Sequence, residues 1–214
     1  MRRSISFVSY RLLFAAFLIL AIGWSAFAGT FSAGATGEGT LIAWLAGLDF
    51  EGEIDGTIRL EGELAPDAGE AVPFCAEGTL RGFGVSGIVT ALTEGWIGYK
   101  VEGHADNGEP IEIRGLLYTS RISVVPLQAD AAFIGTHRAR ILFDGAAHAV
   151  FGEFSGSVRG AAEPADRPGT IQFGGSGTIG FDGETGVEAT PIPLDHPALP
   201  AEFLRYLAEL GFGA

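Results

Sequence analysis

Cysteine is almost absent from this chain of 214 residues, which contains Cys75 alone. An intrachain disulfide is therefore excluded, and the fold must depend on core packing. Cys75 lies in "VPFCAEG", among apolar neighbours and with no histidine or basic residue near it in sequence. Because unpaired cysteines are usually buried, we expect a buried and inert thiol. A reactive thiol or an intermolecular bridge is the alternative.

Basic residues are also scarce, with 13 Lys and Arg against 26 Asp and Glu. Three of the arginines fall within the first 28 residues. The rest of the chain therefore has ten basic residues against 26 acidic ones, a formal charge of −16. Such a charge repels nucleic acid and anionic lipid surfaces. We therefore expect neither of them as a partner.

Motifs for catalysis or cofactor binding are missing as well. No G-x-S-x-G, H-E-x-x-H or C-x-x-C occurs. "GFGVSG" (82–87) has the G-x-G-x-x-G spacing but not the strand-to-helix context that dinucleotide binding requires. The alternating carboxylates of residues 49–55 would lie about 7 Å apart along a strand, too far to share a calcium ion without help from another strand. The sequence therefore predicts no cofactor, no metal site and no catalytic set.

The first 28 residues have the features of a secretory signal peptide. Arg2, Arg3 and Arg11 form a basic start, "LLFAAFLILAIGW" an apolar centre, and Ala26-Phe27-Ala28 an A-x-A cleavage site. An uncleaved membrane anchor is the competing interpretation, although the apolar run of residues 12–28 is near the lower length limit for a span. We expect cleavage, a secreted or periplasmic location and no stable membrane span in the mature protein. Residues 29–214 then form a single domain.

Alternation of apolar and polar residues dominates the rest of the chain and predicts strands. It is clear in "FEGEIDGTIRLEGEL" (50–64), "VFGEFSGSVRG" (150–160) and "TIQFGGSGTIGF" (170–181). "DNGE" between residues 100–105 and 111–115 predicts a hairpin turn. One helix is predicted at residues 200–210, between Pro200 and Gly211. We expect it to plug or flank one end of the β domain.

Glycine recurs on the apolar parity of these segments, as at positions 52, 56 and 62. Segment 50–64 is too long for one flat strand, so it is either a continuous, strongly coiled strand or a hairpin with a three-residue loop at 54–56. In both cases glycine lies on the concave side, where neighbouring strands approach closely. Small residues alternating with large ones on an inner face are typical of a small closed barrel. We therefore predict an all-β, antiparallel, strongly curved barrel, with a β-sandwich as the alternative.

These features favour an exported, non-enzymatic barrel that binds a small apolar ligand or a partner protein. Three alternatives stay open: a small outer-membrane β-barrel, a secreted hydrolase or isomerase on a barrel scaffold, and a structural component of the envelope. Pockets favour aromatic side chains with a polar group. A histidine in phase with Val150 and Phe154 could face the interior. The predicted ligand-binding residues are Trp44, Trp96, Tyr99, Tyr118 and His148.

Overall fold

The computed structural model describes residues 29–46, 49–66, 69–87, 93–125, 130–164 and 169–213. The signal peptide predicted for residues 1–28, and the membrane anchor that was its alternative, lie outside the described residues. Within the described part of the chain, no helix has the length and apolar character needed to cross a membrane.

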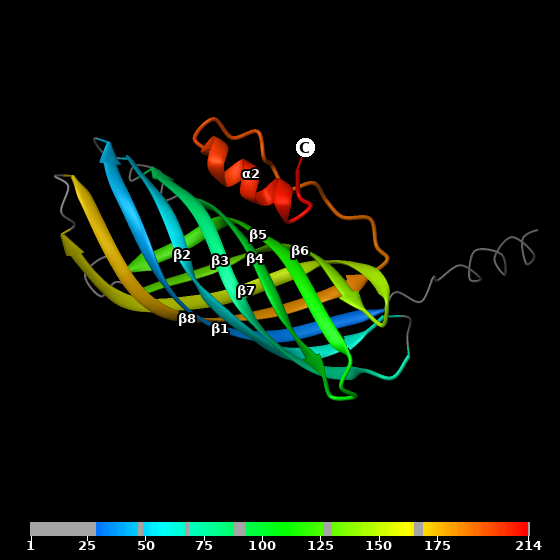
Figure 1. The fold of residues 1–214 in the computed structure, drawn as a ribbon. Helices are drawn as coiled ribbons and strands as arrows, with labels where there is room; N and C mark the ends of the chain where they lie inside the picture. Colours follow the sequence, from blue (N-terminus) through cyan, green and yellow to red (C-terminus); the bar gives the residue numbers. More distant parts are fainter. Residues whose placement is uncertain are drawn as a thin grey trace, which may run out of the picture.

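Eight antiparallel strands form a closed barrel, in which each strand pairs with the next and β8 pairs with β1 (Figure 1). The predicted all-β barrel with one short C-terminal helix is confirmed, and the sandwich alternative is wrong. The elements are β1 (Thr30–Ala46), β2 (Asp49–Ala65), β3 (Val72–Gly87), β4 (Thr93–Ala105), β5 (Pro110–Val125), β6 (Asp130–Phe143), β7 (Ala146–Pro164), β8 (Thr170–Thr185) and α2 (Ala201–Glu209).

Strand β2 answers the question raised by the long alternating segment. It runs unbroken from Asp49 to Ala65 and pairs with β1 and β3 in continuous register. The continuous, coiled strand is therefore the correct interpretation, and the three-residue loop at 54–56 is wrong. Apolar residues of β2 such as Ile58 and Leu60 are buried inside the barrel, whereas Arg59 and Glu61 are exposed on its outer wall.

Inward-facing glycines allow neighbouring strands to approach closely. Gly62 pairs with Ala33, and a side chain at Gly62 would overlap the carbonyl oxygen of Ser32 and lie 2.6 Å from the Ala33 Cα. Gly115 pairs with Tyr99, whose ring occupies the space that a side chain at Gly115 would fill. Glycine on the inner face therefore permits both the tight curvature of the wall and the packing of large rings against it.

The connections after β2, β4 and β6 lie at one end of the barrel, which we call the base, and those after β1, β3, β5 and β7 lie at the other, the mouth. The predicted "DNGE" turn joins β4 to β5, with Gly108 at φ +85° and its amide donating to the Ala105 carbonyl oxygen over 2.8 Å. Asp144 and Gly145, both at positive φ, join β6 to β7 in a tight hairpin.

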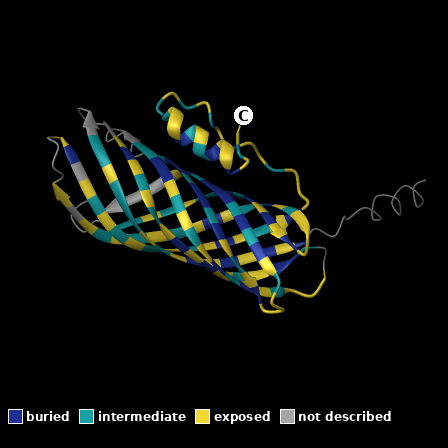
Figure 2. Cartoon of the chain, in the orientation of Figure 1, coloured by how far each residue is buried: buried dark blue, intermediate teal, exposed yellow. Residues whose placement is uncertain are grey.

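The last described residues, 186–213, form a strap that lies on the outer wall of the barrel over β3, β4 and β5 (Figure 1). Helix α2 begins after Pro200 and ends before Gly211, close to the predicted bounds. The expectation that it plugs or flanks a barrel end is wrong, because β3–β5 present an apolar outer patch that covers its apolar face (Figure 2). That patch consists of Phe83, Trp96 and Leu116.

Specific contacts fix the strap to this patch. The Trp96 indole donates to the Pro193 carbonyl oxygen over 2.8 Å, and the Tyr206 hydroxyl donates to the Gly98 carbonyl oxygen over 3.1 Å. A side chain at Gly98 would come within 3.0 Å of three side chains of the strap, so glycine there lets the helix approach the wall. Leu207 is fully buried in the contact.

We expect Gly62→Ala to lower the free energy of unfolding by about 1–3 kcal/mol, because the added methyl group would push β1 and β2 apart. Gly34→Ala is the matched control. Gly34 lies on β1 with outward parity, and the nearest atom to an added Cβ is 4.0 Å away. Chemical denaturation of both variants checks the prediction, and equal effects would contradict the close approach at Gly62.

We expect Leu207→Ala to cost about 2–5 kcal/mol of the packing that holds the strap on the barrel. Release of the strap would expose Trp96, so its emission should shift to longer wavelength while the barrel retains its circular dichroism. Glu202→Ala changes an exposed residue of the same helix and serves as the control. Unchanged emission in both variants would show that Leu207 does not hold the strap in place.

Candidate functional site

The lumen of the barrel divides into a sealed half and an accessible half. Toward the base, the inward-facing apolar side chains are almost all buried, and they form one continuous core. Toward the mouth, the inward-facing side chains are equally apolar but only half-buried. These half-buried residues are Leu41, Ala43, Ile54, Leu80, Ile97, Ala131, Phe133, Val158, Phe173 and Ile179.

A buried polar pair lies where the two halves meet. The Tyr99 hydroxyl on β4 and the His137 Nε2 on β6 are 2.8 Å apart, and both residues are 0% exposed. Their rings stack, with centroids 6.1 Å apart and planes 13° from parallel. Burial lowers the pKa of His137 to about 3 and raises the pKa of Tyr99 well above its usual value. Both side chains are therefore uncharged at neutral pH.

His137 has a second ring nitrogen that is buried without a partner. Its Nδ1 is the one buried side-chain nitrogen or oxygen without a hydrogen bond among the described residues. Buried polar atoms are nearly always hydrogen-bonded, and leaving one unpaired costs about 1–3 kcal/mol. The pair is therefore an unusual feature in an otherwise apolar core.

A chain of aromatic rings connects the accessible half of the lumen to this pair. Phe133 contacts Phe154, with centroids 6.0 Å apart, and Phe154 contacts Phe181 at 6.4 Å. Phe181 contacts the His137 ring at 4.9 Å. Phe133 is half-buried, whereas Phe154 and Phe181 are 5% and 1% exposed. The rings of Phe154 and Phe181 thus form the floor of the accessible half.

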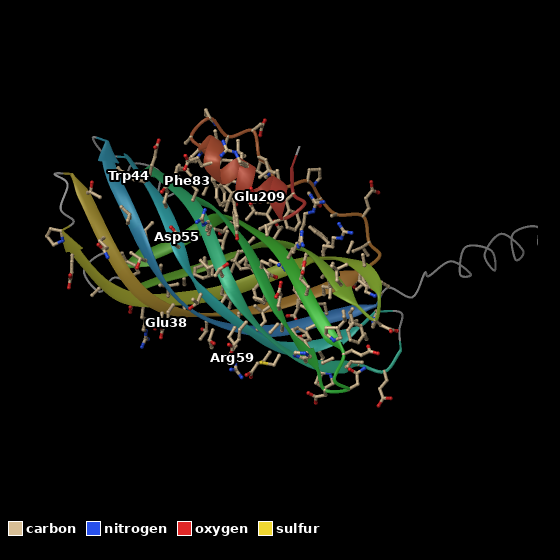
Figure 3. The ribbon with its side chains drawn as sticks, viewed as in Figure 1. Glu38, Trp44, Asp55, Arg59, Phe83 and Glu209 are labelled. Carbon is tan, nitrogen blue, oxygen red and sulfur yellow. The ribbon has the colours of Figure 1, made fainter. Side chains whose placement is uncertain are left out.

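The outer wall has a different character. It carries charged side chains, of which Glu38 and Arg59 project from the barrel in Figure 3. Arg59 forms ion pairs with Glu61 (2.7 Å) and Glu77 (2.5 Å), all half or more exposed. Exposed pairs of this kind contribute little stability. Their effect is to keep this wall hydrated.

Two open depressions of about 1020 and 950 Å³ lie on this outer wall, across β1, β2, β3, β6, β7 and β8. The outward-facing side chains along them are mostly small and hydroxyl-bearing, such as Thr36, Ser157 and Thr178. They contain none of the predicted binding residues and no buried unpaired polar atom. The lumen is therefore the better candidate for a specific site, although the depressions are large.

The structure separates the five residues predicted to bind a ligand. Trp96 and Tyr118 pack together at 5.4 Å under the strap on the outer wall, where the Tyr118 hydroxyl donates to Glu94 over 2.8 Å. Trp44 is half-buried near the mouth with outward parity (Figure 3), and His148 is half-buried at the base rim. Tyr99 lies deep inside the lumen, and His148 has inward parity at its base end, as its phase with Val150 and Phe154 predicted.

The sequence prediction missed His137. A signal was present, since His137 is in phase with Ala139, Ile141 and Phe143 along β6, which are all buried.

The expectation of a buried Cys75 is wrong: its thiol is half-buried at an outward position, between Glu61 and His104 on the neighbouring strands. No cluster of three or more metal-ligating side chains occurs in the part of the chain that the structure describes.

We expect the buried His137 to make the protein less stable as the pH falls. The unfolded chain takes up a proton at this histidine near pH 6.5, whereas the folded protein does so only near pH 3. Between pH 6.5 and 4.5, wild type should therefore lose up to about 1.4 kcal/mol per pH unit relative to His137→Phe.

Urea denaturation of wild type and His137→Phe across this pH range measures that difference. His104→Phe changes an exposed histidine of the outer wall and serves as the control for the substitution itself. A stability difference between wild type and His137→Phe that does not vary with pH would contradict the assigned burial.

Comparisons with known proteins add little to this geometry. No family model matches the chain, and no curated protein matches it. Among solved structures, the translocator domain of the autotransporter NalP from Neisseria meningitidis matches with 11% identity over 81% of this chain and 95% of that chain. The TM-score of 0.17 is too low to support any inference about this protein.

Proposed function

We propose that this protein is an exported, non-enzymatic binding module that holds a small apolar ligand in the mouth half of its lumen. The observation that carries the proposal is the contrast within one apolar lumen. The base half is sealed, whereas side chains of the same chemical type in the mouth half are half-buried. Incompletely covered apolar surface inside a concave wall is typical of ligand sites.

The lining indicates the chemistry of the ligand. Among the described residues with inward parity, none is Asp, Glu, Lys or Arg. Burying an unpaired ionic group in such a place would cost more than its apolar contacts return. The lumen therefore favours an uncharged, mainly apolar ligand.

The same lining favours binding over catalysis. Acid–base chemistry commonly pairs a histidine with a carboxylate, or two carboxylates, within a cleft. His137 pairs with Tyr99 instead, and its low pKa keeps it uncharged at neutral pH. This arrangement gives the hydrolase or isomerase alternative no support.

The outer wall favours a barrel in water over one in lipid. A transmembrane barrel presents an apolar band outward. On β2 the outward positions carry charges along the strand, including Glu53, Arg59 and Glu61, and all three are exposed. Together with the secretory signal predicted from the sequence, this supports a secreted or periplasmic location.

Binding of diphenylhexatriene, a hydrocarbon whose fluorescence rises in apolar surroundings, tests the proposal. We expect wild type to bind this probe, and we expect Val158→Trp to weaken binding at least tenfold by filling the mouth half of the lumen. Ser157→Trp places the same indole one residue away, on the outer wall beside both depressions, and should leave the affinity unchanged.

Val158→Trp and Ser157→Trp also distinguish a binding site in the lumen from one in the outer depressions. Weaker binding in Ser157→Trp, with wild-type affinity in Val158→Trp, would place the probe in the outer depressions and contradict a site in the lumen. Absence of binding to wild type would contradict the proposed function itself. Circular dichroism shows whether each variant retains the fold.

A further inference from the structure

The unpaired nitrogen of His137 can be assigned a chemical state. A neutral imidazole has one N–H donor and one acceptor nitrogen. If Tyr99 donates its hydroxyl hydrogen to Nε2, then one polar atom, the Nδ1–H donor, is left without a partner. If Nε2–H donates to the Tyr99 oxygen instead, both the Tyr99 hydroxyl hydrogen and the Nδ1 lone pair are left without a hydrogen-bond partner. The first arrangement leaves fewer unpaired groups, so Nδ1 carries the hydrogen.

The His137 ring lies beneath the aromatic floor of the accessible half of the lumen, with its centroid 4.9 Å from that of Phe181. On β6, the next inward position toward the mouth is Gly135, which has no side chain. The Phe154 ring occupies that space instead, and a Cβ at Gly135 would lie 2.8 Å from it. Two aromatic rings, Phe154 and Phe181, thus lie between the half-buried Phe133 and the His137 ring. Rotation of these two phenylalanine side chains is a local change.

We propose that His137 recognises the ligand of the lumen, by donating its Nδ1 hydrogen to a carbonyl or ether oxygen on an uncharged, otherwise apolar molecule. This inference rests on the proposed function and adds to it the class of ligand. The hydrogen bond would satisfy the unpaired donor of the core. It would also give an apolar lumen a means of selecting among hydrophobic molecules.

The lining argues against an anionic ligand at this position. A carboxylate at His137 would need a positive partner, and no lysine or arginine occupies a described inward position. Tyr99 cannot supply a charge to the ligand either, because burial keeps its hydroxyl protonated. An oxygen acceptor without charge satisfies Nδ1 and requires no further compensation.

Competition between two matched ligands tests the inference. Octan-2-one and nonane have the same number of non-hydrogen atoms and differ in one carbonyl oxygen. Each is used to displace diphenylhexatriene from wild type and from His137→Phe. The probe has no polar group, so its own binding reports the lumen independently of His137. We expect the preference for the ketone over the alkane to fall by about tenfold in the variant, the loss of one hydrogen bond.

The outcomes separate this inference from the function on which it rests. No probe binding to wild type would overturn both. Probe binding with the same ketone preference in wild type and His137→Phe would overturn the inference and leave the apolar site standing. His137→Phe removes the unpaired Nδ1 but leaves the buried Tyr99 hydroxyl without its partner, so circular dichroism of the variant checks that it folds.

A second measurement uses wild type alone and does not depend on any variant folding. The ¹⁵N resonance of His137 Nδ1 should be that of a protonated nitrogen in the free protein. It should shift when octan-2-one is added and stay in place when nonane is added. A histidine with a purely structural role would respond to both ligands alike, and that result would contradict direct recognition.

Discussion

The close approach of neighbouring strands is the constraint on which the rest of this structure depends. Without disulfides, the chain holds its barrel together by hydrogen bonds between long coiled strands and by packing inside them. Glycine at inward positions makes this curvature possible. At some of these positions the missing side chain also leaves a recess that a large neighbour fills, as the Phe133 ring does at Gly156 and the Tyr99 ring at Gly115. The wall and the core are therefore built by the same alternation of small and large residues.

The outer wall shows the same use of glycine for a different purpose. Gly98 lies with outward parity between Trp96 and Lys100, and its lack of a side chain lets the helix of the strap reach the barrel. The strap then covers an apolar patch that would otherwise face water. Strand β4 consequently carries the strap contact on one face and Ile97 and Tyr99 on the other, so the strap supports the strand that bears half of the buried polar pair.

Much of the fold could be predicted from the sequence, because the two-residue period of a half-buried strand is a local property. The run around Gly56 and Gly62 predicted a curved, closed wall from parity alone. The location of the helix could not be predicted in this way. It depends on an outer apolar patch made by residues on three strands, which only the folded register brings together.

The candidate site was harder to predict for a similar reason. Aromatic residues with polar groups suggested a pocket, but parity places Trp96 and Tyr99 on opposite faces of β4. The alternation of β6 would have placed His137 inside the barrel. It could not have shown that the Tyr99 hydroxyl reaches Nε2 and that no described residue reaches Nδ1, because that depends on the pairing of β4 and β6 through β5.

Two features of the lumen break the pattern of buried apolar side chains and paired polar groups found in the rest of the barrel. These two features lie next to each other. A chain that relies on packing alone leaves apolar side chains of its lumen half-buried, and beneath them it buries a polar atom without a partner. Either feature lowers stability, and natural proteins accept such costs mainly where function requires them. Phe154 and Phe181 connect these two features, because their rings form the floor of the accessible half of the lumen and also cover His137. A ligand that fills the mouth half of the lumen and supplies an oxygen to His137 Nδ1 would remove both costs at once. This is the physical reason for regarding the half-buried side chains and the unpaired nitrogen as one site.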